Sequence, residues 1–124
     1  MFRTPKSVIA LDAVTATTTS EKIYVEDAKK ITLILTRANH DSGSSAFSVL
    51  ASIDGTTYIT INSMIEDLAN TNAQNYTRVA SITLASDGNT LAAVDCKNNQ
   101  YKYIKIKVTE TTDGTHTAKA YISY

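Results

Sequence analysis

The stretch Phe47–Ile61, FSVLASIDGTTYITI, predicts two β-strands joined by an Asp-Gly turn. A three-residue loop, Ile53–Gly55, with its glycine in the left-handed conformation, would place Val49 opposite Ile59. This register puts apolar side chains on one face and serines and threonines on the other, whereas a two-residue loop would mix the faces. The stretch therefore predicts an antiparallel hairpin with one face in a hydrophobic core.

The same Asp-Gly turn recurs at Asp87–Gly88 and at Asp113–Gly114. At the second of these, a three-residue loop would pair Val108 with Ala118 and leave lysines on the outer face. At the first, loops of two and three residues fit equally well. The turn chemistry thus predicts three hairpins in the second two-thirds of the chain, but it indicates no reaction.

Apolar periodicity predicts further strands along the chain. They cover Ser7–Val14, Glu21–Val25, Ile31–Arg37, Thr77–Leu84, Leu91–Val94, Tyr101–Thr109 and Ala118–Tyr124. The run Leu33–Leu35 indicates a strand buried on both faces or one in a central position. Ser63 and Glu66 match a capping box, which predicts a short helix at Met64–Ala69.

About eight short strands with one short helix are typical of an antiparallel β-sandwich or jelly roll. A chain of 124 residues fits a single domain. We expect an N-terminal arm at residues 1–6 and one β-sandwich domain at residues 7–124.

Composition narrows the range of partners. The formal net charge is zero, which disfavours nucleic acid as a partner. The chain lacks an apolar run of the roughly 18 residues that a membrane helix needs, and its first residues lack the features of a signal peptide. We therefore expect a soluble protein without a membrane partner. Charged residues make up 19% of the chain, and a β surface with so few charges indicates a surface that a partner covers.

Catalytic motifs are absent from the sequence. The single cysteine, Cys96, cannot form an internal disulfide. Two histidines, His40 and His116, lie in loops rich in small polar residues, without the context of a nucleophilic hydrolase. Zinc usually needs three or four Cys or His ligands, and the whole chain contains one cysteine and two histidines. We expect no enzyme activity, no cofactor and no metal site.

The segments FSVLASIDGTTY (47–58) and YKYIKIKVTETTDGT (101–115), followed by a terminal strand, resemble small β-sandwich proteins of tailed bacteriophages. The segment Glu21–Thr36 is similar to the opening of those proteins, so the resemblance covers residues 21–124. Members of this group are virion structural, head-decoration or tail-associated proteins.

This resemblance implies a non-enzymatic auxiliary capsid protein, of the decoration or cement type, that binds and stabilises the capsid lattice. The implied partners are the major capsid protein or another virion protein, and further copies of the chain in a homo-oligomer, often a trimer. The implied location is the virion, and the host cytoplasm before assembly.

Two alternative functions stay open. The pattern S-x-D-G-x-x-aromatic also occurs in discoidin-like, galactose-binding jelly rolls, which implies a carbohydrate-binding module or the receptor-binding part of a fibre. A glycan would then stack on Tyr58, on the outer face of the first hairpin. A tail tube, connector or baseplate component is the second alternative.

Predicted partner-binding residues lie in the N-terminal arm, on the outer face of the first hairpin and in the uncharged loop after the predicted helix. They are Arg3, Lys6, Tyr58, Asn70, Thr71, Asn72, Gln74 and Asn75. Weak contacts of this kind, summed over a lattice, would give firm attachment.

Overall fold

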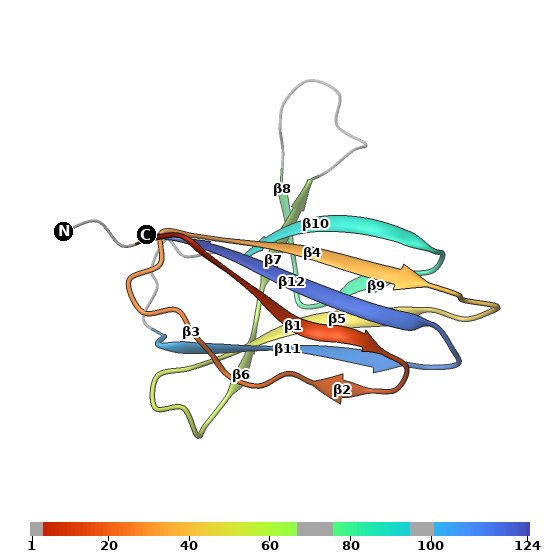
Figure 1. The fold of residues 1–124 in the computed structure, drawn as a ribbon, viewed down its shortest axis with the longest axis horizontal. Helices are drawn as coiled ribbons and strands as arrows, with labels where there is room; N and C mark the ends of the chain where they lie inside the picture. The colour runs from red at the N-terminus through yellow and green to blue at the C-terminus, as the bar shows by residue number, and fades with distance from the viewer. Residues whose placement is uncertain (1–3, 67–75, 95–100) are drawn as a thin grey trace.

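Two antiparallel sheets enclose the core in the computed structural model, which describes residues 4–66, 76–94 and 101–124 (Figure 1). Sheet A contains, in spatial order, β1 (Lys6–Val14), β12 (Thr115–Ser123), β4 (Lys30–Ala38), β10 (Gly88–Val94), β7 (Ser63–Glu66) and β8 (Tyr76–Val79). Sheet B contains β2 (Thr18–Thr19), β11 (Tyr103–Glu110), β5 (Ser45–Ser52) and β6 (Ile59–Ile61), while β3 (Ile23–Tyr24) pairs with β11 and β9 (Ile82–Leu84) pairs with β5.

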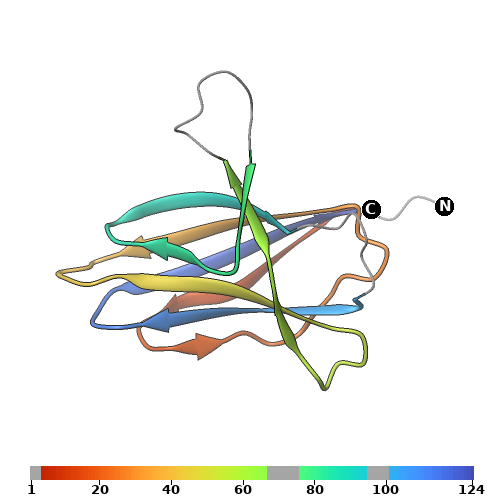
Figure 2. The same ribbon diagram turned by 180° about the vertical axis from the view of Figure 1, so that it is seen from behind.

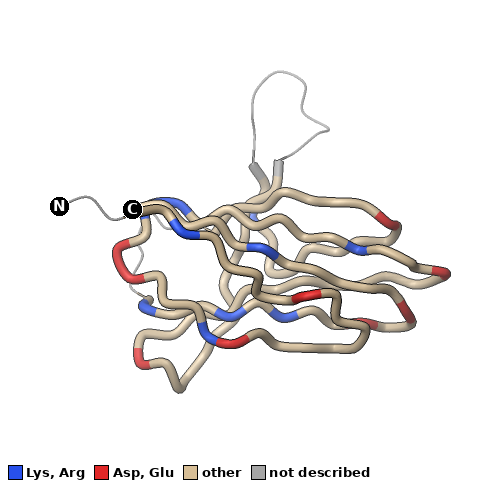
Figure 3. The backbone as a smooth tube through the Cα atoms, in the orientation of Figure 1, with Lys and Arg blue, Asp and Glu red and all other residues tan. Residues whose placement is uncertain are grey.

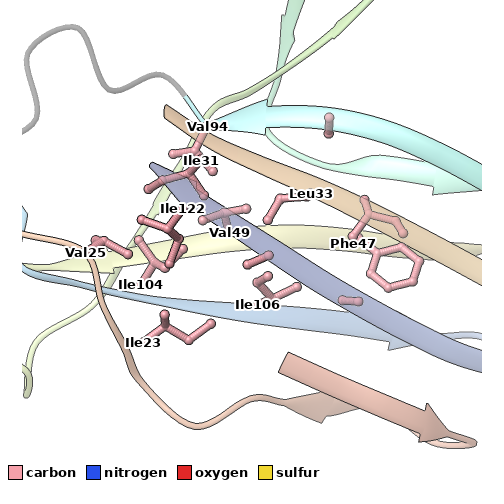
Figure 4. Close-up of a cluster of buried hydrophobic side chains, with 14 of the residues drawn as sticks. Ile23, Val25, Ile31, Leu33, Phe47, Val49, Val94, Ile104, Ile106 and Ile122 are labelled. Carbon is pink, nitrogen blue, oxygen red and sulfur yellow. The ribbon is translucent and has the colours of Figure 1, made fainter. Parts of the chain in front are cut away.

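The core consists of the inward-facing residues of the long strands (Figure 4). On β4, Leu33 and Leu35 are buried, and on β11, Ile104 and Ile106 are buried, whereas the residues between them are only partly covered. This period of two residues arises when one face of each strand meets the core. Each fully buried Leu or Ile side chain contributes roughly 1.5–3 kcal/mol to stability.

The predicted all-β class is confirmed, and β4 holds the central position that the run Leu33–Leu35 indicated, between β12 and β10. The described residues form twelve strands rather than about eight, because one predicted strand is divided and because β2 and β7 form where no strand was predicted. For example, the predicted strand Thr77–Leu84 is divided into β8 and β9, which belong to different sheets.

The predicted helix at Met64–Ala69 is wrong where the structure describes it. Residues Ser63–Glu66 form β7, which pairs with β10 on one side and with β8 on the other. Strands on both sides satisfy the backbone N–H and C=O groups of this segment, and this tertiary pairing overrides the local preference of a capping box. Residues 67–69 of the predicted helix lie outside the described residues.

One side of the sandwich is closed by a strand that changes sheets. β6 pairs with β5 in sheet B, and β7 pairs with β10 in sheet A, although only Asn62 separates them. Figure 2 shows this segment crossing from one sheet to the other.

The hairpin at Asp54–Gly55 exists with a longer loop than predicted. Val49 pairs with Ile61 rather than with Ile59. The Ser52 hydroxyl accepts the Gly55 N–H at 2.9 Å, and this local turn lengthens the loop. The shift in partner is two residues, so the alternation of the two faces is kept. The burial differs at two positions, because Ile59, predicted to face the core, is 65% exposed and Ser52, predicted on the outer face, is buried. Gly55 has the predicted left-handed conformation, with φ of 78°.

The hairpins predicted at the other two Asp-Gly turns are wrong. β9 and β10 belong to different sheets, and so do β11 and β12. Val108 therefore pairs with Phe47 of β5 instead of Ala118, while Ala118 pairs with Leu11 and Leu35. Both of these turns connect sheet B to sheet A. An inward-facing residue is buried equally well beside its neighbour or across the core from it, so the apolar pattern did not distinguish these arrangements.

Candidate interaction surfaces

Ser45 and His116 form a buried pair between the two sheets. His116 Nε2 lies 2.6 Å from Ser45 Oγ, and His116 Nδ1 lies 3.1 Å from the carbonyl oxygen of Val14. Since a carbonyl can only accept, Nδ1 carries the proton, and Nε2 accepts from the Ser45 hydroxyl. The exposed fractions of Ser45 and His116 are 1% and 0%. The pair is closed to a substrate and serves to satisfy two buried polar groups.

Arg37 is the largest buried polar side chain at the same end of the sandwich. Its Nη1 donates to the carbonyl oxygens of Gly43 and Leu84, each at 3.0 Å. Its Nη2 donates to the carbonyl oxygens of Ser42 at 3.0 Å and Asp113 at 2.9 Å. Arg37 therefore joins the loop after β4, the end of β9 and the loop before β12, and its role is structural.

The described part of the chain contains neither a candidate metal site nor a helix that could span a membrane. Residues 4–66, 76–94 and 101–124 contain no group of three or more His, Cys, Asp or Glu side chains that could hold a metal ion. Within the same ranges, no helix is long and apolar enough to cross a membrane.

Tyr58 lies on the outer face of sheet B, as predicted, but its ring is partly covered. Lys105 Nζ lies 4.4 Å from the ring centroid, within the range of a cation–π contact. Burial raises the pKa of the Tyr58 phenol above its ordinary value. Its hydroxyl is buried and meets no hydrogen-bond partner among the described residues. One face of the ring is therefore already occupied by a side chain of the protein itself.

A second aromatic and cationic group lies on the same sheet, beside the β5–β6 turn. The rings of Tyr24 and Tyr103 pack with their centroids 5.5 Å apart. Lys22 Nζ lies 5.0 Å from the Tyr103 centroid, and Lys6 Nζ donates to the Tyr24 carbonyl oxygen at 2.8 Å. The outer face of sheet B is thus rich in tyrosine and lysine, and Lys6 is held in place by it.

The outer face of sheet A carries a row of apolar side chains among polar ones. Cross-strand register places Ile9, Lys119, Ile34 and Leu91 in one row across β1, β12, β4 and β10. Ile9 is 57% exposed and Leu91 is 66% exposed, and Tyr121 is also exposed beside Lys119 on β12. We call Ile9, Ile34, Leu91 and Tyr121 the apolar face. Exposed apolar side chains gathered on one surface mark interaction sites in soluble proteins.

Two of the eight predicted partner-binding residues lie in the part of the chain that the structure describes. Lys6 and Tyr58 are described, and they lie on different parts of the surface. The others, Arg3, Asn70, Thr71, Asn72, Gln74 and Asn75, lie outside the described residues. The sequence prediction missed the apolar face, although the run Leu33–Leu35 had indicated an apolar residue on both faces of β4.

A cleft of about 590 Å³ lies at the β5–β6 turn, where it is lined by Ile53, Ile59 and Tyr101, with Asp54 at its rim. Ile53 and Ile59 are exposed. The Asp54 carboxylate accepts the backbone N–H groups of Thr57 and Thr56 at 2.8 Å each, and these bonds lower its pKa from 3.8 to about 2. Asp54 is therefore engaged in the turn, which leaves the cleft mainly apolar.

The fold and these surfaces define an all-β protein with a hydrophobic core, a few buried polar side chains that are closed to solvent, and two outer faces. The fold is shared with a solved structure, the SPBc2 prophage-derived protein YomS, with a TM-score of 0.69 over 98% of this chain and 94% of that chain. The two sequences are 12% identical, so the likeness concerns the fold. No protein family and no curated protein matches the sequence.

Proposed function

We propose that this chain is a non-enzymatic structural protein of a phage particle, and specifically an auxiliary capsid protein that attaches to the capsid lattice. The observation that carries the proposal is the apolar face of sheet A. Ile9 and Leu91 are more than half exposed on sheet A, with one lysine in their row. Such a face suits contact with another protein surface.

The shared fold supports the phage part of the proposal. The likeness to the prophage-derived protein extends over almost the full length of both chains. The buried Ser45–His116 pair also fits a structural role, because the two side chains hydrogen-bond to each other and neither is accessible to a substrate.

Attachment through this face would be strengthened by repetition. A single contact through a few exposed apolar side chains is weak, but many copies bound to neighbouring lattice positions stabilise the lattice together. The low charge of the apolar face limits the desolvation cost of each contact.

Quantitative mass spectrometry of purified particles of the parent phage tests the location. We expect copy numbers on the order of hundreds, as a shell component requires. A handful of copies would instead indicate a connector or fibre, and absence from particles would contradict the proposal.

A variant pair tests the surface. Ile9→Lys combined with Leu91→Lys places two charges on the apolar face and should abolish binding to particles that lack the protein. Thr19→Lys combined with Thr109→Lys is the matched control, because both threonines are exposed on sheet B. Equal loss of particle binding in both variants would show that added charge, rather than the apolar face, is responsible.

A glycan array tests the carbohydrate alternative. We expect no glycan binding through Tyr58, because Lys105 covers one face of its ring. Binding that disappears in Tyr58→Ala would favour a receptor-binding role over capsid attachment.

A further inference from the structure

One end of the sandwich is acidic. This end, where β4 and β11 finish and β10 and β12 begin, carries Asp41, Asp87, Glu110 and Asp113. Figure 3 shows acidic segments gathered there. Among the described residues, the basic side chain at this end is that of Arg37, which is buried and donates hydrogen bonds to backbone carbonyl oxygens. The surface of this end therefore carries net negative charge.

Hydrogen bonds within the loops fix these carboxylates in place. The Asp113 carboxylate accepts the backbone N–H of Asp41 at 3.0 Å, and the Asp87 carboxylate accepts the backbone N–H of His40 at 3.1 Å. The Asp41 side chain is exposed, and its carboxylate bonds to no other described residue. It is the carboxylate of this group most available to a partner.

The opposite end of sheet A carries a basic groove. Its volume is about 340 Å³, and Lys6, Lys30, Ser7, Thr32, Tyr121 and Ser123 line it. No carboxylate is among the described residues of its lining. Lys6 is held by its bond to the Tyr24 carbonyl, whereas the Lys30 ammonium group is exposed and bonds to no other described residue.

The acidic end and the basic groove lie at the two ends of one strand. β4 runs from Lys30 to Ala38, nine residues, which spans about 26 Å at ~3.3 Å per residue. The formal net charge of the chain is zero, so neither end reflects a general excess of one charge. Acidic residues also lie near the groove, since Glu26 and Asp27 belong to the loop just before β4. The described lining of the groove itself nevertheless contains no carboxylate.

We propose that the acidic end of one copy docks into the basic groove of a second copy, head to tail. Asp41 of one copy would approach Lys30 of the next, and the hydroxyl groups of Ser7, Thr32 and Ser123 would donate hydrogen bonds to the incoming carboxylates. Such a contact joins two different surfaces, so its repetition produces a ring or a filament rather than a closed pair. The inference goes beyond the proposed function, because it does not depend on which particle component the protein is.

A second copy suits the groove better than a nucleic acid. A polyanion that reached the groove would also meet the acidic end of the same molecule, and the neutral chain offers no general attraction to phosphate. Another copy presents its carboxylates on one compact end, and its own basic groove then faces away.

Sedimentation velocity on the full-length protein tests the proposal. We expect species larger than a monomer at an ionic strength of about 0.01 M and dissociation at about 1 M, because the screening length falls from about 30 Å to about 3 Å. A monomer at both ionic strengths would overturn the proposal, as would association that does not respond to salt.

Charge reversal provides the specific test. Asp41→Lys and Lys30→Glu should each weaken self-association at low salt by at least about ten-fold. The double variant carries both reversed charges and should recover the association, and so should an equimolar mixture of the two single variants. Circular dichroism should show an unchanged fold, since both side chains are exposed.

Matched controls reverse charges away from the two ends. Lys107→Glu lies on sheet B and Asp12→Lys lies on β1, and both should associate like the unmodified protein. Equal weakening by the controls, or failure of the double variant to recover association, would overturn the proposed contact. Particle binding is measured separately, so a failure of this contact leaves the proposed capsid role testable on its own.

Discussion

Arg37 and Asp113 meet at one end of the sandwich, where the guanidinium group donates to the Asp113 carbonyl oxygen at 2.9 Å and lies 3.5 Å from its carboxylate. Arg37 lies on β4, and Asp113 lies in the loop before β12. The Asp113 carboxylate in turn accepts backbone N–H groups of Asp41 and Ser42. The Asp113–Gly114 turn is therefore fixed by contacts to another loop as it passes from sheet B to sheet A.

Replacement of Arg37 by Leu should lower the free energy of unfolding by about 1–3 kcal/mol, because the partly buried carbonyl oxygens that accept its hydrogen bonds lose their donor. Urea denaturation at neutral pH measures the change. Lys119→Leu is the control, since Lys119 is exposed on β12 and should change stability by less than about 0.5 kcal/mol. A loss below about 1 kcal/mol for Arg37→Leu would contradict the structural role of this side chain.

Replacement of Ser45 by Ala should cost about 1–3 kcal/mol, because His116 Nε2 would be left buried without a partner. Ser48→Ala on the opposite face of β5 is the matched control and should cost less than about 0.5 kcal/mol. Thermal unfolding compares the two variants. If Ser45→Ala kept full stability and abolished a hydrolytic activity, the pair would be catalytic instead.

The hydrogen bonds at Asp54 should make the free energy of unfolding depend on pH. The backbone N–H groups of Thr57 and Thr56 lower the pKa of Asp54 from 3.8 to about 2. The unfolded state therefore binds more protons between these two values, so this part of the stability is present above pH 3.8 and is lost as the pH falls toward 2.

Asp54→Asn should remove that part of the pH dependence. Unfolding midpoints measured from pH 5 to about pH 2 should fall less steeply in Asp54→Asn than in the unmodified protein. Asp41→Asn serves as the control, because no backbone N–H donates to the Asp41 carboxylate among the described residues, and its profile should match that of the unmodified protein. Identical profiles for Asp54→Asn and the unmodified protein would contradict this assignment.

The core and the apolar face should respond differently to truncation. Ile106 is fully buried, and Ile106→Ala should cost about 2–5 kcal/mol of stability. Ile9→Ala, on the apolar face, should change stability by less than about 0.5 kcal/mol, since its side chain is 57% exposed. Chemical denaturation of both variants measures the contrast. A large loss of stability in Ile9→Ala would show that Ile9 serves the fold rather than a partner.

The sequence predicted which side of each main strand faces the core. Val49 on β5 and Ile106 on β11 are buried as their alternation required, and Gly55 adopts the left-handed conformation that its turn needs. These features depend on residues close together in the chain, so a local pattern is sufficient to predict them.

The candidate interaction surfaces were harder to predict from the sequence. Tyr58 was correctly placed on an outer face, but the Lys105 contact that covers its ring depends on strand pairing. The row of Ile9, Ile34 and Leu91 forms only when β1, β4 and β10 join one sheet, so no local pattern contains it.

The amino-acid pattern by itself determined the all-β class, the core-facing side of the long strands and the positions of the Asp-Gly turns. Tertiary structure alone decided that the turns at Asp87 and Asp113 connect two sheets, and that Ser63–Glu66 is a strand rather than a helix. The reason is that burial and backbone hydrogen bonding can be satisfied by any suitable neighbour, and the neighbour is chosen by the packing of the whole chain.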